Sequence, residues 1–245
     1  MARLGVSTFA FFSAALAVSL CLSAYALGGP LVKPVGWGPL TSKEAAKRVK
    51  RSDFEPRPSN SEENQTRPTA EQIAEFRAQS DMPYAGFVDG RFRGTTDEII
   101  QWAAKKWGFH PDLFRAVARY ESYWDMNTLG DSGDSFGLFQ VRRPYHCCLP
   151  YMRDSTAFNA DYYGGITRAY FDGQQDWLNN PDVAVNNIGR YVAGDLWGSI
   201  GAWVTGNWHV ARNEEYVETV KGFIQSQPWR NYQYFAEPWY EPLPE

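Results

Sequence analysis

Two neighbouring segments with helical periodicity, residues 95–108 and 110–122, constrain the fold most strongly. The first begins with a threonine that can cap a helix, carries acidic residues in its first turn and ends at Gly108. Its apolar positions are Ile99, Ile100, Trp102, Ala103 and Trp107. The second segment has Pro111 in its first turn. Its apolar stripe consists of Leu113, Phe114, Val117 and Ala118. Such stripes are typical of helices that pack against a common core.

Further helices are expected along the rest of the chain, where strand-like alternation is nearly absent. The segments with helical character are residues 159–178, 182–196 and 213–226. We therefore predict a mainly α-helical domain over residues 93–228, which is long enough to bury one hydrophobic core.

Both ends of the chain differ in composition from this region. Residues 1–26 contain an uncharged apolar run that closes with Ala-Tyr-Ala, which is typical of a secretory signal peptide cleaved after Ala26. An uncleaved membrane anchor is the alternative, because the run is nearly long enough to span a bilayer. Either way the rest of the chain is expected to leave the cytoplasm, as a secreted or anchored protein associated with the cell wall. Residues 27–92, rich in Pro, Ser and charge, are predicted to be a disordered linker, and residues 229–245 an aromatic, proline-rich tail.

The composition argues against nucleic acids and metals as ligands. The formal net charge is −4 and the sequence has no basic stripe, so we expect no nucleic-acid partner. For the same reason, any contact with an anionic polymer must be local. Cys147 and Cys148 follow His146, but three consecutive residues cannot easily surround one ion, so no metal or other cofactor is expected. The spacing is compatible with a vicinal disulfide and with two free thiols.

Glu121 is the candidate general acid/base. It lies four residues after Val117, so it continues the apolar face of its helix at the last turn. Burial against Tyr120, Tyr123 or Trp124 would disfavour the ionised carboxylate and raise its pKa. A raised pKa is what a general acid near neutral pH requires. A capping or core carboxylate is the alternative role.

The loop after Glu121 matches a calcium-binding loop only in part. Counted from Asp125, its fifth and twelfth positions are Leu129 and Phe136. An oxygen ligand and a bidentate glutamate belong at those two positions. We therefore expect no calcium ion to bind in this loop.

Three motifs give the chain a resemblance to a known family. They are Tyr-Glu-Ser at 120–122, Gly-Asp-Ser-Gly-Asp-Ser-Phe-Gly-Leu-Phe-Gln-Val at 130–141, and Ile-Gly-Ala-Trp-Val-Thr-Gly-Asn-Trp-His-Val at 200–210. In this order, over roughly residues 95–225, they resemble the lysozyme-like superfamily of lytic transglycosylases and goose-type lysozymes. The resemblance implies a lysozyme-like helical domain with an active-site cleft. It also implies a monomeric enzyme of the cell wall that binds peptidoglycan glycan strands and cleaves the β-1,4 bond between N-acetylmuramic acid and N-acetylglucosamine, with Glu121 as acid/base.

The resemblance also suggests roles for the loop residues. Asp131 matches a second carboxylate that would activate water in an inverting hydrolase. Asp134 fits that position less well, and the alternative role of Asp131 is a turn residue bonded to its own backbone. A lytic transglycosylase needs no such base, because the substrate's N-acetyl group assists and its 6-hydroxyl attacks to give a 1,6-anhydro product. Candidate substrate-binding residues are Ser135, Gly137, Phe139, Gln140, Tyr191 and Trp203. Loop support and core packing are their alternative roles.

Three positions depart from the family pattern. Phe139 replaces a methionine, Val204 replaces an asparagine, and Arg142 stands where goose-type lysozymes carry an acid. The missing acid favours a lytic transglycosylase, whereas Asp131 keeps muramidase hydrolysis as the alternative. Val204 supports a third hypothesis, a peptidoglycan-binding protein without catalysis.

Overall fold

The computed structural model describes residues 29–146 and 149–235. The chain divides into two compact units, Met1–Leu31 and Val32–Glu245, and every element below belongs to the second. The predicted signal peptide (1–26), Cys147, Cys148 and residues 236–245 of the predicted tail lie outside the described residues. Within the described ranges, no helix has the length and apolar character needed to cross a membrane.

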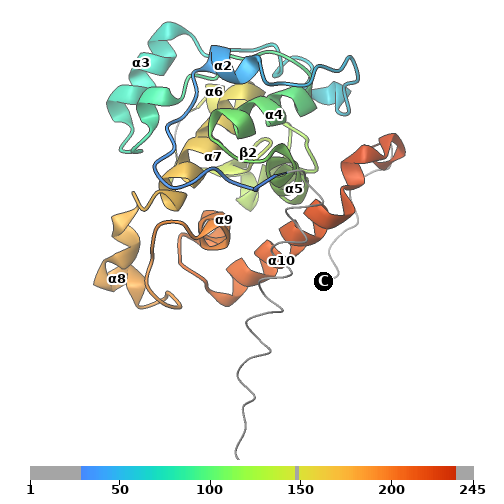
Figure 1. Ribbon diagram of the computed structural model, residues 1–245. Coiled ribbons are helices and arrows are strands. Elements are labelled where there is room, and N and C mark those ends of the chain that lie inside the picture. Colours follow the sequence, from blue (N-terminus) through green and yellow to red (C-terminus); the bar gives the residue numbers. More distant parts are fainter. Residues whose placement is uncertain (1–28, 147–148, 236–245) are drawn as a thin grey trace, which may run out of the picture. The chain divides into compact units, whose positions relative to one another are not determined.

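The described part of the second unit is mainly helical, with one small sheet (Figure 1). Its longer helices are α3 (Ala70–Gln79), α4 (Thr96–Lys106), α5 (Pro111–Ser122), α7 (Thr156–Phe171), α9 (Leu196–Thr205) and α10 (Ala211–Ser226). Its short helices are α2 (Ser42–Ala46), α6 (Tyr151–Asp154) and α8 (Pro181–Ala184). The antiparallel sheet has the order β1 (Leu129–Gly130), β2 (Ser135–Phe136) and β3 (Val141–Arg142). Single 3₁₀ turns are η1 (Pro58–Asn60), η2 (Ala85–Phe87), η3 (Asp131–Gly133), η4 (Asp176–Asn179), η5 (Pro228–Arg230) and η6 (Tyr232–Phe235).

Helices α4 and α5 confirm the expectation for residues 95–122. The Thr95 side chain accepts a hydrogen bond from the Glu98 backbone N–H, and the Glu98 carboxylate accepts one from the Thr95 N–H. This reciprocal capping satisfies two N–H groups that a helix start otherwise leaves without partners. The chain turns at Gly108, whose φ of 77° suits glycine, and α5 then begins at Pro111.

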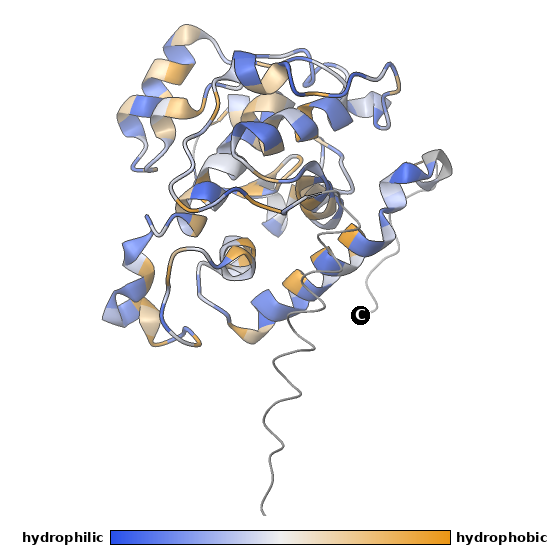
Figure 2. Cartoon of the chain, viewed as in Figure 1, coloured by the Kyte–Doolittle hydropathy of each residue, from blue (hydrophilic) through white to orange (hydrophobic). Residues whose placement is uncertain are grey.

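The expected helix at 182–196 is wrong beyond its first turn. After α8 the chain forms a loop with φ of 83° at Gly189 and 88° at Gly194, which a continuous α-helix does not allow. Helix α9 was not among the predicted helices, because its largely apolar sequence shows no stripe. Helices α7 and α10 agree with the predictions for 159–178 and 213–226 apart from their ends, and Figure 2 shows the alternating hydrophobic and hydrophilic bands of α10.

The core forms where α4 packs on α7 and where α10 packs on α5 and α9 (Figure 1). Gly164 lets α7 approach α4 closely, since a Cβ there would lie 2.2 Å from Cδ1 of Trp107. Phe139, from the loop between β2 and β3, stacks on Tyr163 of α7 with 4.3 Å between ring centroids. Aromatic side chains therefore connect the helices to the sheet.

The predicted disordered linker, residues 27–92, disagrees with the structure from Val32 onward. Residues 32–92 belong to the same compact unit as α4–α10 and form α2 and α3. Phe76 of α3 is fully buried and packs edge-to-face on Phe158 of α7 at 5.4 Å. The buried apolar residues of this segment stand singly among polar ones, so its composition resembles that of a disordered chain although it supplies part of the core.

A buried charge cluster fastens this N-terminal segment to the helices. The fully buried Lys106 ammonium of α4 lies 2.7 Å from the Asp161 carboxylate of α7 and 3.2 Å from that of Asp89. It also donates to the Ser42 hydroxyl at 3.1 Å. Asp161 in turn accepts hydrogen bonds from the Trp107 indole and from the backbone N–H of Asp89. Every member is thus paired, as buried charges require.

The described part of the C-terminal tail packs beside the end of α5. Trp229 of η5 stacks on Trp124 with 6.3 Å between centroids, and Phe235 of η6 lies 4.8 Å from the same ring. Both aromatic side chains are buried. They cover the Trp124 ring just beyond the C-terminal end of α5.

Candidate active site

Glu121 lies at the penultimate position of α5, and its carboxylate turns toward α10. The Tyr216 hydroxyl of α10 donates a hydrogen bond to Oε1 of Glu121 at 2.7 Å. Tyr216 is almost completely buried, whereas Glu121 is half-buried and keeps part of its surface open to solvent. The Tyr120 ring packs edge-to-face on Tyr216 at 4.5 Å. The carboxylate therefore sits in an aromatic setting with a single hydroxyl donor.

The surroundings of Glu121 favour its protonated form. Burial raises the pKa of Glu121 to about 8, the hydrogen bond from Tyr216 opposes this rise, and the negative charge of Asp131 adds to it. The carboxyl group thus holds a proton at neutral pH. Of the three aromatic residues expected to bury it, Tyr123 and Trp124 turn away: both have positive φ, and the Trp124 indole donates to the Arg115 carbonyl at 2.9 Å.

The sheet is held at the end of α5 by buried side chains. The Ser122 hydroxyl donates to the Leu138 carbonyl at 2.9 Å. Asn159 of α7 accepts from the Phe139 N–H at 2.9 Å and donates to the Phe136 carbonyl at 3.0 Å. These bonds fix the β2–β3 turn against α5 and α7. Asp131 lies in the preceding connection of the same sheet, between β1 and β2.

Asp131 lies in η3 with φ of 48° and faces the sheet. Its Oδ2 accepts a hydrogen bond from the Ser135 hydroxyl at 2.5 Å and lies 3.4 Å from Nε of Arg142. The side chain is 43 % exposed, so water can still reach it. Asp134 pairs with Arg143 at 2.7 Å, whereas the acid whose charge raises the pKa of Glu121 is Asp131. Of the two acids considered in this loop, Asp131 is the one that acts on Glu121.

Several residues expected to bind substrate have contacts within the protein. A Cβ on Gly137 would lie 2.8 Å from the Met126 thioether, so this glycine allows close packing. The Phe139 side chain is fully buried, and the Gln140 amide donates to the Gly137 carbonyl at 2.9 Å. Tyr191 is buried and donates to the Tyr170 carbonyl at 2.7 Å.

The remaining candidates, Ser135 and Trp203, differ in their exposure to solvent. Ser135 is buried, and its hydroxyl donates the hydrogen bond to Asp131 described above. Trp203 of α9 is partly exposed, donates to the Phe139 carbonyl at 3.2 Å and stacks on His146 with 4.9 Å between centroids. Burial lowers the pKa of His146 to about 4, so this imidazole is neutral at neutral pH.

A groove of about 940 Å³ is lined in part by Arg142, the residue that contacts Asp131. Its walls include Arg142, His146, Tyr162, Trp203, Val204 and Arg212. Neither Glu121 nor Asp131 lines this groove, but Asp131 is connected to it through Arg142. The groove is mixed in character, with aromatic faces, two arginines and the acids Asp81, Asp176 and Asp182, as a site for a polar, ring-containing ligand requires.

No family model, curated protein or solved structure matches this chain. In the described ranges, no three His, Cys, Asp or Glu side chains are grouped in a way that could hold a metal ion.

Tyr216 is the functional residue that the sequence did not reveal. It is 95 residues from Glu121 and lies outside the three motifs. The available signal was its place on the buried face of α10, together with Val217, Val220 and Ile224. A tyrosine on an apolar face needs a partner for its hydroxyl.

Replacing Tyr216 by Phe is expected to raise the pKa of Glu121 further. The hydroxyl stabilises the ionised carboxylate, and burial remains when it is removed. The pKa is measured from the ¹³C chemical shift of the Glu121 carboxyl carbon during a pH titration. Tyr120→Phe is the matched control, since it removes a neighbouring hydroxyl that does not contact Glu121. An unchanged or lower pKa in Tyr216→Phe would contradict the role assigned to this hydrogen bond.

Proposed function

We propose that the protein cleaves the β-1,4 bond between N-acetylmuramic acid and N-acetylglucosamine in peptidoglycan, with Glu121 as general acid/base. The observation that carries the proposal is the raised pKa of Glu121, about 8, at the end of α5 and within reach of the charge of Asp131. Breaking a glycosidic bond requires a proton for the leaving oxygen, and a carboxyl group that stays protonated at neutral pH provides it.

The fold proposed for this activity is lysozyme-like. In support, hydrogen bonds join the three motifs that resemble the family. The Ser122 hydroxyl of the first motif donates to the Leu138 carbonyl of the second. Trp203 connects the last two through its bond to the Phe139 carbonyl. The predicted signal peptide would place such an enzyme outside the cell, at the wall.

A lytic transglycosylase is the form of the reaction that we favour. The guanidinium of Arg142 lies 3.4 Å from Asp131, and Ser135 donates to the same carboxylate oxygen. These two partners occupy the carboxylate oxygen that would otherwise be free to bind and activate a water molecule. In the transglycosylase, Glu121 first protonates the leaving oxygen and then accepts the proton of the substrate's 6-hydroxyl, which closes the 1,6-anhydro ring.

Muramidase hydrolysis is the second candidate, and one observation favours it. The charge of Asp131 is close enough to raise the pKa of Glu121, so the two carboxyl groups face one site. An inverting hydrolase needs a second carboxylate about 6.5–9.5 Å from the acid to activate water. In that mechanism Asp131 would be the base.

Product mass and an Asp131→Asn variant distinguish the two reactions. A transglycosylase releases muropeptides lighter by one water molecule than those of a hydrolase, and Asp131→Asn retains activity within roughly tenfold. A hydrolase gives the heavier product and loses roughly 10²–10⁴-fold in Asp131→Asn. Asp134→Asn is the control, because it removes a loop acid paired only with Arg143. Binding to purified walls without release of either product would refute both and leave a wall-binding protein.

A further inference from the structure

A second, basic groove lies on the N-terminal segment, beside α2. Its volume is about 440 Å³, and its lining includes Lys43, Arg51, Arg67, Arg91 and Arg93. All five cationic side chains are exposed. They are concentrated within residues 43–93 of a chain whose net charge is −4.

Most of these cations have no anionic partner. Arg51 pairs with Glu98 at 3.0 Å. Asp89, the one acid in the lining, is already bonded to Lys106 at 3.2 Å and to the Ser42 hydroxyl at 2.6 Å. Within residues 29–146 and 149–235, no carboxylate lies in ion-pair distance of the other four cations, Lys43, Arg67, Arg91 and Arg93.

The cations also crowd one another. Partial burial lowers the pKa of Arg67, and the neighbouring Arg93 and Arg91 lower it further. Like charges brought together in a concave surface raise the local positive potential. A bound anion would reduce this repulsion between the cations. The groove is therefore electrostatically suited to a negatively charged ligand.

The backbone beneath these arginines is fixed in place. Arg91 and Arg93 are exposed on either side of Phe92, whose buried ring stacks on Trp102 at 5.4 Å. The backbone N–H groups of Asp89 and Gly90 donate to the buried Asp161 carboxylate at 2.9 and 3.0 Å. The two guanidinium groups therefore extend from a rigid base, which lowers the ordering cost of binding.

We propose that this basic groove binds the phosphate groups of a flexible polyol-phosphate polymer of the cell wall. Guanidinium groups match phosphate oxygens with paired hydrogen bonds, and four unpaired cations suit a ligand with repeated negative charges. The lining has no exposed large apolar side chain to enter a membrane and no exposed aromatic ring for bases to stack on. The choice of a wall polymer rests on the proposed function, whereas the preference for phosphate rests on the groove alone.

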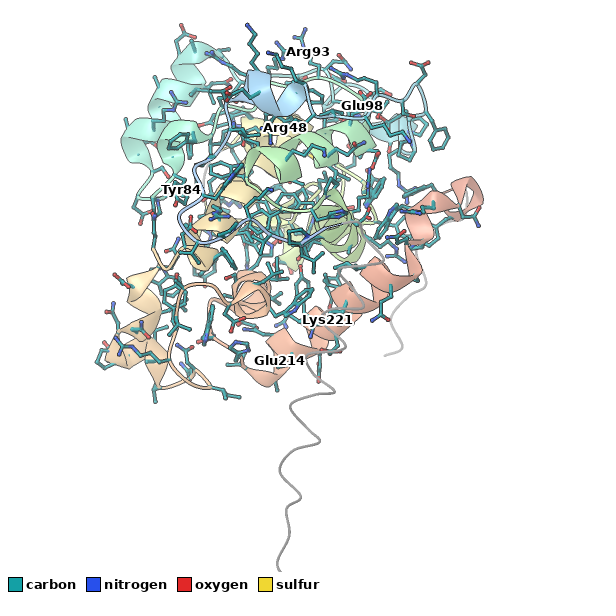
Figure 3. All side chains as sticks on the ribbon, in the orientation of Figure 1. Arg48, Tyr84, Arg93, Glu98, Glu214 and Lys221 are labelled. Atoms are coloured by element: carbon teal, nitrogen blue, oxygen red, sulfur yellow. The ribbon has the colours of Figure 1, made fainter. Side chains whose placement is uncertain are left out.

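This groove is separate from the candidate active site. Arg93 and Arg48 lie on the α2 side of the unit, and Glu214 and Lys221 of α10 lie at the opposite side of the same view (Figure 3). The two grooves have no lining residue in common, so polymer bound at the basic groove leaves the groove lined by Arg142 and Trp203 open. The protein would be held on the wall by one surface and would cleave glycan with another.

Binding of poly(glycerol phosphate) to the full chain tests the proposal. The triple variant Arg67→Gln/Arg91→Gln/Arg93→Gln is expected to lose at least tenfold in affinity, measured by titration calorimetry at low salt. The double variant Arg190→Gln/Arg230→Gln, which neutralises exposed arginines elsewhere, is the control and should stay within twofold of the wild type. In the wild type, the slope of log affinity against log salt should be about −3 for four phosphate contacts. This slope needs no variant, so it tests the groove even if the triple variant unfolds.

Three results would overturn the proposal. They are a triple variant within twofold of the wild type, a salt slope near zero, and equal or tighter binding of poly-glutamate, single-stranded DNA or anionic phosphatidylglycerol vesicles. The Glu121→Gln variant should bind the polymer like the wild type. Polymer binding without wall cleavage would thus refute the proposed function alone, and cleavage without polymer binding would refute the basic groove alone.

Discussion

Glu121→Gln is expected to abolish wall cleavage and to leave the fold intact. The amide has the shape of the carboxyl group and can still accept the hydrogen bond from Tyr216, but it has no acidic proton to give. General acid/base catalysis typically contributes 10²–10⁴-fold, so a loss of roughly that size is expected. The measurement is the release of soluble muropeptides from purified cell walls.

Glu215→Gln is the matched control for this substitution. Glu215 is an exposed acid on α10, near enough for its charge to act on Tyr120, but it does not contact Glu121. Its removal should change the rate by less than twofold. A loss below twofold in Glu121→Gln itself would refute the assignment of Glu121 as the acid.

The stability of the same variant should depend on pH in a defined direction. Because the pKa of Glu121 is raised from 4.5 to about 8, the folded protein keeps a proton that the unfolded chain releases in this range. This contribution to stability is complete below about pH 4.5 and is lost as the pH rises through about 8. Glu121→Gln lacks it, so its melting temperature relative to the wild type should increase between about pH 5 and about pH 9.

The largest loss of stability is expected for Lys106→Ala. This substitution removes the cation that lies 2.7 Å from Asp161 and 3.2 Å from Asp89, and it leaves two carboxylates in the interior without a counter-charge. Breaking a buried ion pair in this way costs about 3–5 kcal/mol. Urea denaturation measures the loss. Limited proteolysis should also show earlier cleavage within residues 32–92, since Asp89 and Ser42 lose their link to α4.

Lys105→Ala gives the comparison for Lys106→Ala. It removes the adjacent lysine of the same helix, which is only partly buried and forms no ion pair. The cost should be below about 1 kcal/mol. Equal costs for the two substitutions would contradict the role of the buried cluster.

The helices that could be predicted are those whose signals are local. The caps and apolar stripes of α4 and α5 lie within short stretches of sequence. The bounds of these two helices can therefore be predicted closely. The prediction of a disordered linker is wrong for residues 32–92, because these residues are folded through contacts with residues far away in the sequence. Phe76 is buried by Phe158 of α7, and Asn60 is fully buried through bonds to Thr96 and the Trp124 carbonyl. Composition over a short window does not contain such contacts.

In the candidate site, too, local features could be predicted from the sequence and contacts between distant segments could not. The helical register alone singled out Glu121, and its raised pKa agrees with the expectation. Its partner Tyr216 could not be found in this way, because the bond joins α5 to α10. The substrate-binding roles expected for Gly137, Gln140 and Tyr191 stay predictions, and the packing or hydrogen-bond contact that the structure gives each of them could not be predicted from the motifs.

If the proposed function holds, the folded state of residues 32–92 determines how the protein can search a wall. Sixty flexible residues would let a catalytic domain range over about 40 Å around its attachment point, by the random-coil relation between length and reach. Folded onto α4 and α7, the same residues give no such freedom. They instead keep the basic groove at a constant distance from Glu121. The distance between the surface that holds the wall and the residue that cleaves it would then be fixed by the fold of the protein.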